Sequence, residues 1–104
     1  MSLDGRGRRI EVLIDLDRFD QAERECRELL TLDPDNYTAR YSLVRCLQKS
    51  RRLDEGLEQS SALVQLYPDN AWVHYLHSYQ LLLLGRKAEA IQSSRQAVEC
   101  DPQD

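Results

Sequence analysis

The sequence predicts an all-α fold, an array of three helix-turn-helix repeats, because it carries a fixed internal period. Its prolines stand at positions 34, 68 and 102, separated by 34 residues each time. Each proline lies in a turn-forming segment that ends one helix and offers an Asp or Asn cap to the next. A period of this length is typical of stacked repeats that pack on their neighbours.

Other side chains return at the same interval. The recurring sets are Leu13, Leu47 and Leu81; Arg18, Arg52 and Arg86; Ala22, Gly56 and Ala90; and Cys26, Ser60 and Ser94. The last two sets are small residues four apart, which lie on one side of a helix. We expect them to let the second helix of each repeat approach its paired first helix closely.

The first repeat covers residues 3–36. Its first helix is expected to begin near Arg8, since Gly5 and Gly7 each disfavour a helix by about 1 kcal/mol relative to alanine. Its second helix is predicted from Phe19 to Leu32 by the apolar periodicity. This first repeat is degenerate at its N-terminal end.

The second repeat covers residues 37–70 and the third 71–104, so residues 3–104 make a single repeat domain. In the second repeat, the adjacent Arg51 and Arg52 separate two helical apolar stripes. In the third repeat, Gly85 is a natural helix stop, and the second helix is predicted from about Lys87 to Cys100.

Composition narrows the function classes. The chain has 104 residues, with 14 Lys and Arg against 18 Asp and Glu, a formal charge of -4. This acidic balance argues against a nucleic acid partner. The longest apolar run, Leu81 to Leu84, is far short of the roughly 18 residues that span a bilayer. With no secretory signal and three widely spaced cysteines, we expect a cytoplasmic protein without membrane contact.

The 34-residue helix-turn-helix unit resembles the tetratricopeptide repeat. The family's small residue early in the second helix is met by Ala22, Gly56 and Ala90, and its helix-ending proline by Pro34, Pro68 and Pro102. The resemblance covers residues 3–104, although the family's Trp-Leu-Gly signature in the first helix is poorly kept. It implies a right-handed α-solenoid whose concave face, lined by the first helix of each unit, binds peptides.

Mapping that face onto the sequence gives the predicted partner-binding residues. They recur at helical spacing on two first helices: Tyr41, Arg45, Gln48, Lys49, Trp72, Tyr75, Tyr79 and Leu82. The middle of this stripe is basic and its C-terminal part is aromatic and aliphatic. We therefore expect an adaptor or scaffold whose protein or peptide partner carries acidic and apolar or aromatic residues. The competing interpretation is that the aromatic side chains only fill contacts between units.

A second hypothesis is self-association or assembly, either as a homodimer or as part of a longer repeat protein. Repeat arrays need polar caps at their ends, and the last predicted helix has none after it. The residues expected to be exposed there are Leu84, Ile91 and Val98. Contiguous exposed apolar side chains usually mark an interface.

The sequence predicts no enzyme, no metal and no cofactor. His74 and His77 lie one helical turn apart, but a zinc site needs three or four ligands. We expect His77 to be partly buried and hydrogen-bonded instead. Cys26 is expected to be a small core residue, and Cys100 the most exposed thiol.

RNA binding is the remaining alternative. Basic residues gather in the second repeat around Tyr41, and helical repeats bind RNA through such residues and stacked aromatic rings. The acidic charge of the whole chain and the usual solvation of charged helix faces disfavour this interpretation.

Overall fold

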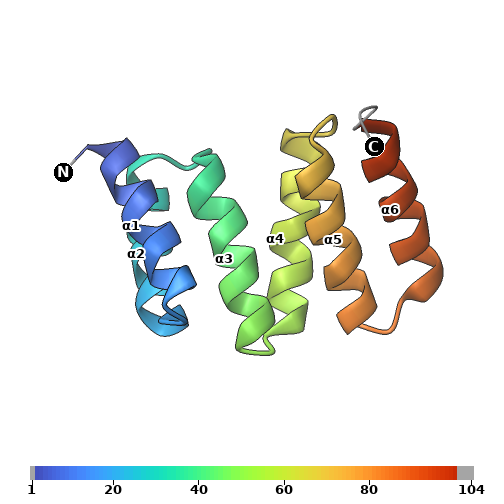
Figure 1. Cartoon of the computed structure of the whole chain (residues 1–104), viewed down its shortest axis with the longest axis horizontal. Helices are drawn as coiled ribbons and strands as arrows, with labels where there is room; N and C mark the ends of the chain where they lie inside the picture. Colours follow the sequence, from blue (N-terminus) through green and yellow to red (C-terminus); the bar gives the residue numbers. More distant parts are fainter. Residues whose placement is uncertain (1, 101–104) are drawn as a thin grey trace. The chain divides into compact units, whose positions relative to one another are not determined.

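A computed structural model of the chain describes residues 2–100, which form six α-helices and no β-strand within that range (Figure 1). The helices are α1 (Leu3–Asp15), α2 (Phe19–Leu32), α3 (Tyr37–Lys49), α4 (Leu53–Leu66), α5 (Ala71–Leu83) and α6 (Lys87–Cys100). They follow one another as helix-turn-helix repeats, so the predicted all-α class is confirmed.

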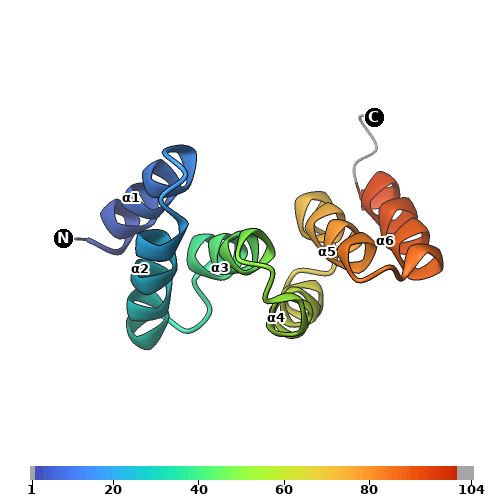
Figure 2. The same ribbon diagram turned by 90° about the horizontal axis from the view of Figure 1, so that it is seen from below.

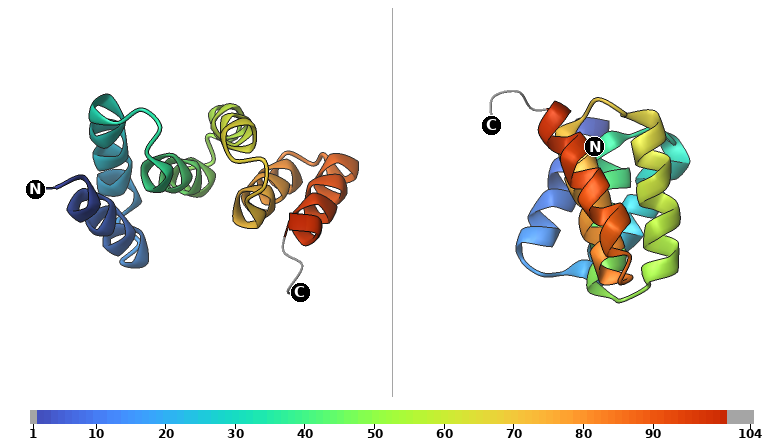
Figure 3. Two further views of the ribbon diagram at one scale, coloured as in Figure 1. Left: turned by 90° about the horizontal axis from the view of Figure 1, so that it is seen from above. Right: turned by 90° about the vertical axis from the view of Figure 1, so that its right-hand side faces the viewer.

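The chain divides between Arg52 and Leu53 into two compact units. In the N-terminal unit (α1–α3), α2 packs on both α1 and α3, and α3 also contacts α1 (Figure 2). In the C-terminal unit (α4–α6), α5 packs on both α4 and α6, and α5 and α6 lie side by side (Figure 3). Each unit therefore contains one helix that the other two share.

The predicted asparagine caps are confirmed at two of the proline turns. The Asn36 side-chain oxygen accepts a hydrogen bond from the Ala39 amide at 2.9 Å, which starts α3. Asn70 accepts one from the Val73 amide at 3.2 Å, which starts α5. Each bond satisfies an amide that has no partner in the first helical turn. The third turn, at Pro102, lies outside the described residues.

The predicted bounds of α2 and α6 are confirmed, whereas the predicted start of α1 at Arg8 is wrong. The helix begins at Leu3, where the Ser2 hydroxyl caps it by accepting the Gly5 amide at 3.1 Å. Gly7 is buried, and a Cβ there would lie 3.5 Å from the methyl group of Thr38 in α3. Capping and packing thus outweigh the low helix propensity of the two glycines.

The core of the N-terminal unit is built from all three of its helices. The contributing buried side chains are Ile10, Leu13 and Ile14 from α1; Ala22, Cys26 and Leu29 from α2; and Ala39, Leu43, Cys46 and Leu47 from α3. Phe19 and Leu30 pack against this cluster while remaining partly exposed. Since α3 buries four residues in this cluster, it serves as the cover of the α1–α2 pair.

Small residues of α4 bring α5 close in the C-terminal unit. A Cβ at Gly56 would lie 2.8 Å from Oε1 of Gln80, a fully buried side chain whose Nε2 donates to the Leu53 carbonyl at 2.7 Å. The Ser60 hydroxyl lies 2.7 Å from Nδ1 of His77. Gly56 and Ser60 thus contact the first helix of the following repeat, whereas the sequence predicted a contact with their own repeat.

The small pair of α6 behaves as predicted. The hydroxyl of Ser78 in α5 donates to the Ala90 carbonyl at 2.8 Å and lies 2.7 Å from the Ser94 hydroxyl. Ala90 and Ser94 therefore let α6 approach its paired first helix, α5.

Replacing Gly56 with alanine tests the α4–α5 contact. The added methyl group displaces the Gln80 amide and breaks its hydrogen bond to Leu53 inside the protein. We expect the free energy of unfolding, measured by urea titration, to fall by about 1–3 kcal/mol.

The control is the same substitution combined with Gln80→Ala. Without the amide, Gly56→Ala should be neutral or stabilising, since alanine favours a helix by about 1 kcal/mol over glycine. An equal loss in both backgrounds would contradict the contact.

Candidate functional site

The exposed aromatic side chains within residues 2–100 all lie on α5. Trp72 is 69% exposed, Tyr75 36% and Tyr79 53%. The spacing of three and then four residues places them along one side of the helix. The rings of Trp72 and Tyr75 meet edge to face, with their centroids 6.3 Å apart. We call these three residues the aromatic face of α5.

Hydrogen bonds on the remaining sides of α5 fix its orientation. His74 donates from Nε2 to the Pro68 carbonyl at 2.6 Å, because a carbonyl oxygen only accepts. Ser78 is bonded to α6, and Gln80 to the start of α4. The C-terminal unit therefore holds the aromatic face outward on a helix anchored by its neighbours.

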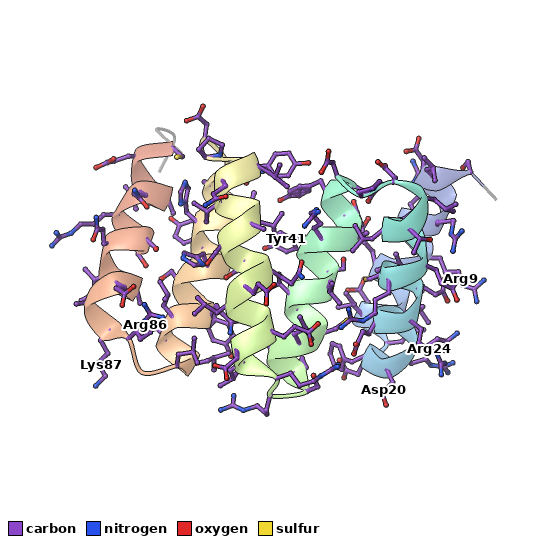
Figure 4. All side chains as sticks on the ribbon, turned by 180° about the vertical axis from the view of Figure 1, so that it is seen from behind. Arg9, Asp20, Arg24, Tyr41, Arg86 and Lys87 are labelled. Atoms are coloured by element: carbon purple, nitrogen blue, oxygen red, sulfur yellow. The ribbon has the colours of Figure 1, made fainter. Side chains whose placement is uncertain are left out.

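A second candidate surface lies on α3, in the N-terminal unit. Tyr41 is half-buried and stacks on Tyr37, with centroids 5.6 Å apart and planes at 24° (Figure 4). Arg45 and Lys49 are exposed, and the Lys49 ammonium lies 5.8 Å from the centre of the Phe19 ring, a cation–π contact. Burial raises the pKa of the Tyr41 hydroxyl, which keeps it protonated. We call Tyr41, Arg45 and Lys49 the basic face of α3.

Gln48 does not join the basic face, contrary to prediction. It is only 7% exposed, because it lies one helical turn after the buried Val44. Ile14, the residue 34 positions earlier, is buried as well. The polar side chain suggested an exposed position, but the packing of α3 places it inside.

An apolar groove runs between α5 and α6 in the C-terminal unit. It has a volume of about 480 Å³ and is lined by Ser78, Leu82, Ala90, Ile91, Ser94, Arg95, Val98 and Glu99. We call it the apolar groove. Leu82, which the sequence assigned to the same face as Tyr79, lies here with Ile91 and Val98.

The predicted exposure of Ile91 and Val98 is confirmed, since they are 55% and 51% exposed. Leu84 differs from them. It caps the C-terminal end of α5, is half-buried and is not among the residues that line the groove.

The histidines and cysteines have structural surroundings. His77 is half-buried and bonded to Ser60, as predicted, and Cys26 is fully buried. The hydrogen bond from Cys46, together with burial, raises the pKa of the Cys26 thiol, so that it stays protonated and unreactive. Within residues 2–100, no group of three or more His, Cys, Asp or Glu side chains is placed to hold a metal ion. In the same range, no helix combines the length and apolarity needed to cross a membrane.

Comparison with protein families matches the tetratricopeptide repeat twice, over residues 13–77 and over residues 71–104. The first match alone covers more than half of the chain. Comparison with curated proteins gives no match.

Solved structures share the fold. MamA (41-end) from Desulfovibrio magneticus RS-1 has a TM-score of 0.85 at 21% identity, over 99% of this chain and 58% of its own. MamA from MSR-1 has a TM-score of 0.84 at 20% identity, over 98% and 59%. YrrB, described as a TPR protein with an unusual peptide-binding site, has a TM-score of 0.85 at 22% identity, over 98% and 53%. The chain spans less than two thirds of each of these three structures.

The burial of His77 makes the stability of the fold depend on pH. Burial lowers its pKa in the folded protein, so the unfolded chain binds a proton first as the pH falls through about 6.5. The contribution of neutral His77 is present above that pH and is lost progressively below it. We expect the urea midpoint to fall more between about pH 7.5 and 5.5 in the wild type than in His77→Gln. Equal falls would contradict this assignment.

Proposed function

The chain belongs to the tetratricopeptide repeat family, and we propose that it is an adaptor that binds a partner polypeptide through the aromatic face of α5. Proteins of this family are protein-interaction modules, so a protein partner is the general expectation. The observation that carries the specific proposal is that Trp72, Tyr75 and Tyr79 are exposed together on one side of an anchored helix.

Exposed Trp and Tyr side chains are well suited to binding a peptide. Each offers a large apolar ring with few rotatable bonds and one polar atom, so that little conformational entropy is lost on binding. Such residues dominate the energy of many protein interfaces. The partner of this face therefore presents apolar or aromatic side chains.

The basic face of α3 adds a preference for acidic residues. Arg45 and Lys49 stand one helical turn apart and are exposed, in a chain whose net charge is -4. Local positive charge steers an acidic peptide toward this surface and discriminates against basic ones. The two faces lie in different compact units, and each is proposed on its own contacts.

The same chain is proposed to have no catalytic activity. The tetratricopeptide repeat is a scaffold fold that is typically non-catalytic. The buried thiol of Cys26 and the hydrogen-bonded ring of His77 serve packing in this structure.

A second candidate function is assembly of the chain with itself. The observation that favours it is the apolar groove, where Leu82, Ile91 and Val98 are each more than half exposed. Exposed apolar side chains clustered in this way mark an interaction surface.

The adaptor function is tested with a random peptide library displayed on phage. Peptides selected on the wild-type protein should carry aromatic or apolar residues, and Trp72→Ala should weaken their binding, measured by fluorescence anisotropy, about 30-fold, as expected for losing about 2 kcal/mol at a central interface residue. Gln92→Ala, an exposed change on α6 outside the groove lining, is the control. Unchanged binding by Trp72→Ala would remove the aromatic face from the site.

Charge reversal tests the basic face separately. The double variant Arg45→Glu, Lys49→Glu should lose the acidic peptides among those selected, and the loss should shrink as salt rises. The control reverses two exposed cations elsewhere, Arg24 and Lys87, with the same change in net charge. Equal effects of the two double variants would show that net charge, and not this face, selects the peptides.

A further inference from the structure

The apolar groove between α5 and α6 has a counterpart in the same chain that is filled. Ala71 and Lys87, the first residues of α5 and α6, lie 68 residues, twice 34, after Leu3 and Phe19, the first residues of α1 and α2. The α5–α6 pair therefore repeats the α1–α2 pair. By this register, the groove residues Ser78, Leu82, Ala90, Ser94 and Val98 correspond to Ile10, Ile14, Ala22, Cys26 and Leu30.

On the α1–α2 pair, this surface is covered by α3. Four of the five corresponding residues belong to the core that α3 completes with Ala39, Leu43, Cys46 and Leu47, and Leu30 packs against that core. The difference in exposure shows the effect of the cover: Ile14 is 2% exposed and Leu82 is 52% exposed. The groove is thus a seat for the first helix of a repeat, and no helix within residues 2–100 occupies it.

A helix that fits this seat presents the face that α3 presents. On α3 that face is used in the N-terminal core. The corresponding face of α5 is used as well, because His77 is bonded to Ser60 and Gln80 to Leu53, both in α4. The two later first helices are therefore not available.

The corresponding face of α1 is open among the described residues. Its members, 34 positions before those of α3, are Gly5, Arg9, Val12 and Leu13. Val12 is 55% exposed, and Leu16, one turn further along the same side, is 58% exposed. The chain therefore carries both an empty seat and an uncovered helix face of the matching register.

Arg9 stands where α3 has Leu43, and burying its charge would be costly. Its guanidinium forms an ion pair with Glu25 of α2 at 3.0 Å, and it lines a polar pocket between α1 and α2 together with Arg24 (Figure 4). These contacts draw the charge toward α2. They leave Val12 and Leu16 as the apolar part of the face.

We propose that the apolar groove binds α1 of a second copy of this chain, so that copies join head to tail. Val12 of one copy then lies over Ala90 and Ser94 of the other, as Cys46 lies over Ala22 and Cys26 within the N-terminal unit. The inference rests on the assembly function proposed above and specifies its contact. The joined surfaces differ, so each pair of copies keeps one free groove and one free α1, and association continues into longer oligomers.

Two charged variants test the contact by complementation. Val12→Glu disables α1 but keeps the groove, whereas Val98→Glu disables the groove but keeps α1. In sedimentation velocity experiments, we expect each variant alone to be monomeric at concentrations where the wild type forms oligomers. An equimolar mixture should form a 1:1 complex and nothing larger. Gln92→Glu, on an exposed part of α6 outside the groove lining, should associate like the wild type.

The outcomes separate this inference from the functions above. If Val12→Glu still self-associates, or if the mixture stays monomeric, the head-to-tail contact is wrong. Self-association by Val12→Glu that Val98→Glu abolishes would assign the groove to a symmetric pairing and leave the assembly function standing. A wild-type protein that stays monomeric would overturn both the inference and the assembly function. Peptide binding through Trp72 would be unaffected in every case.

Discussion

The structure depends on one recurring contact, in which the small residues of a second helix admit the first helix of the next repeat. In the N-terminal unit, Cys26 of α2 is bonded to Cys46 of α3. In the C-terminal unit, Gly56 of α4 lies against Gln80 of α5, at the same two places in the 34-residue register. Larger side chains there would separate the helices, since protein interiors leave no spare volume. The period in the sequence is thus a period of close approach.

This contact decides which surfaces remain for function. Once α3 and α5 have buried one side against the preceding helix, their other side chains are turned outward, and these include the basic face of α3 and the aromatic face of α5. The last small pair, Ala90 and Ser94, lines a groove without a covering helix among the described residues. Peptide binding and assembly therefore arise from different sides of the same packing scheme.

The repeat period was enough to predict the helices, the turns and much of the candidate site. It recovered α2 and α6, the caps at Asn36 and Asn70, and the exposure of Trp72, because these follow from local chemistry and phase. The start of α1 was missed because the Ser2 cap and the packing of Gly7 on Thr38 are tertiary effects. Burial of Gln48 and the place of Leu82 in the groove depend on which helix covers which surface, and a single sequence does not give that information.

The most direct test of this account is an NMR measurement of the contact itself. In the C-terminal unit, nuclear Overhauser effects should connect the side-chain amide protons of Gln80 with the α-protons of Gly56, because a Cβ at Gly56 would touch that amide. Observing them would establish that the small residue of one repeat receives the first helix of the next. Their absence, with the Gln80 amide exchanging freely with water, would contradict the packing scheme on which both proposed surfaces depend.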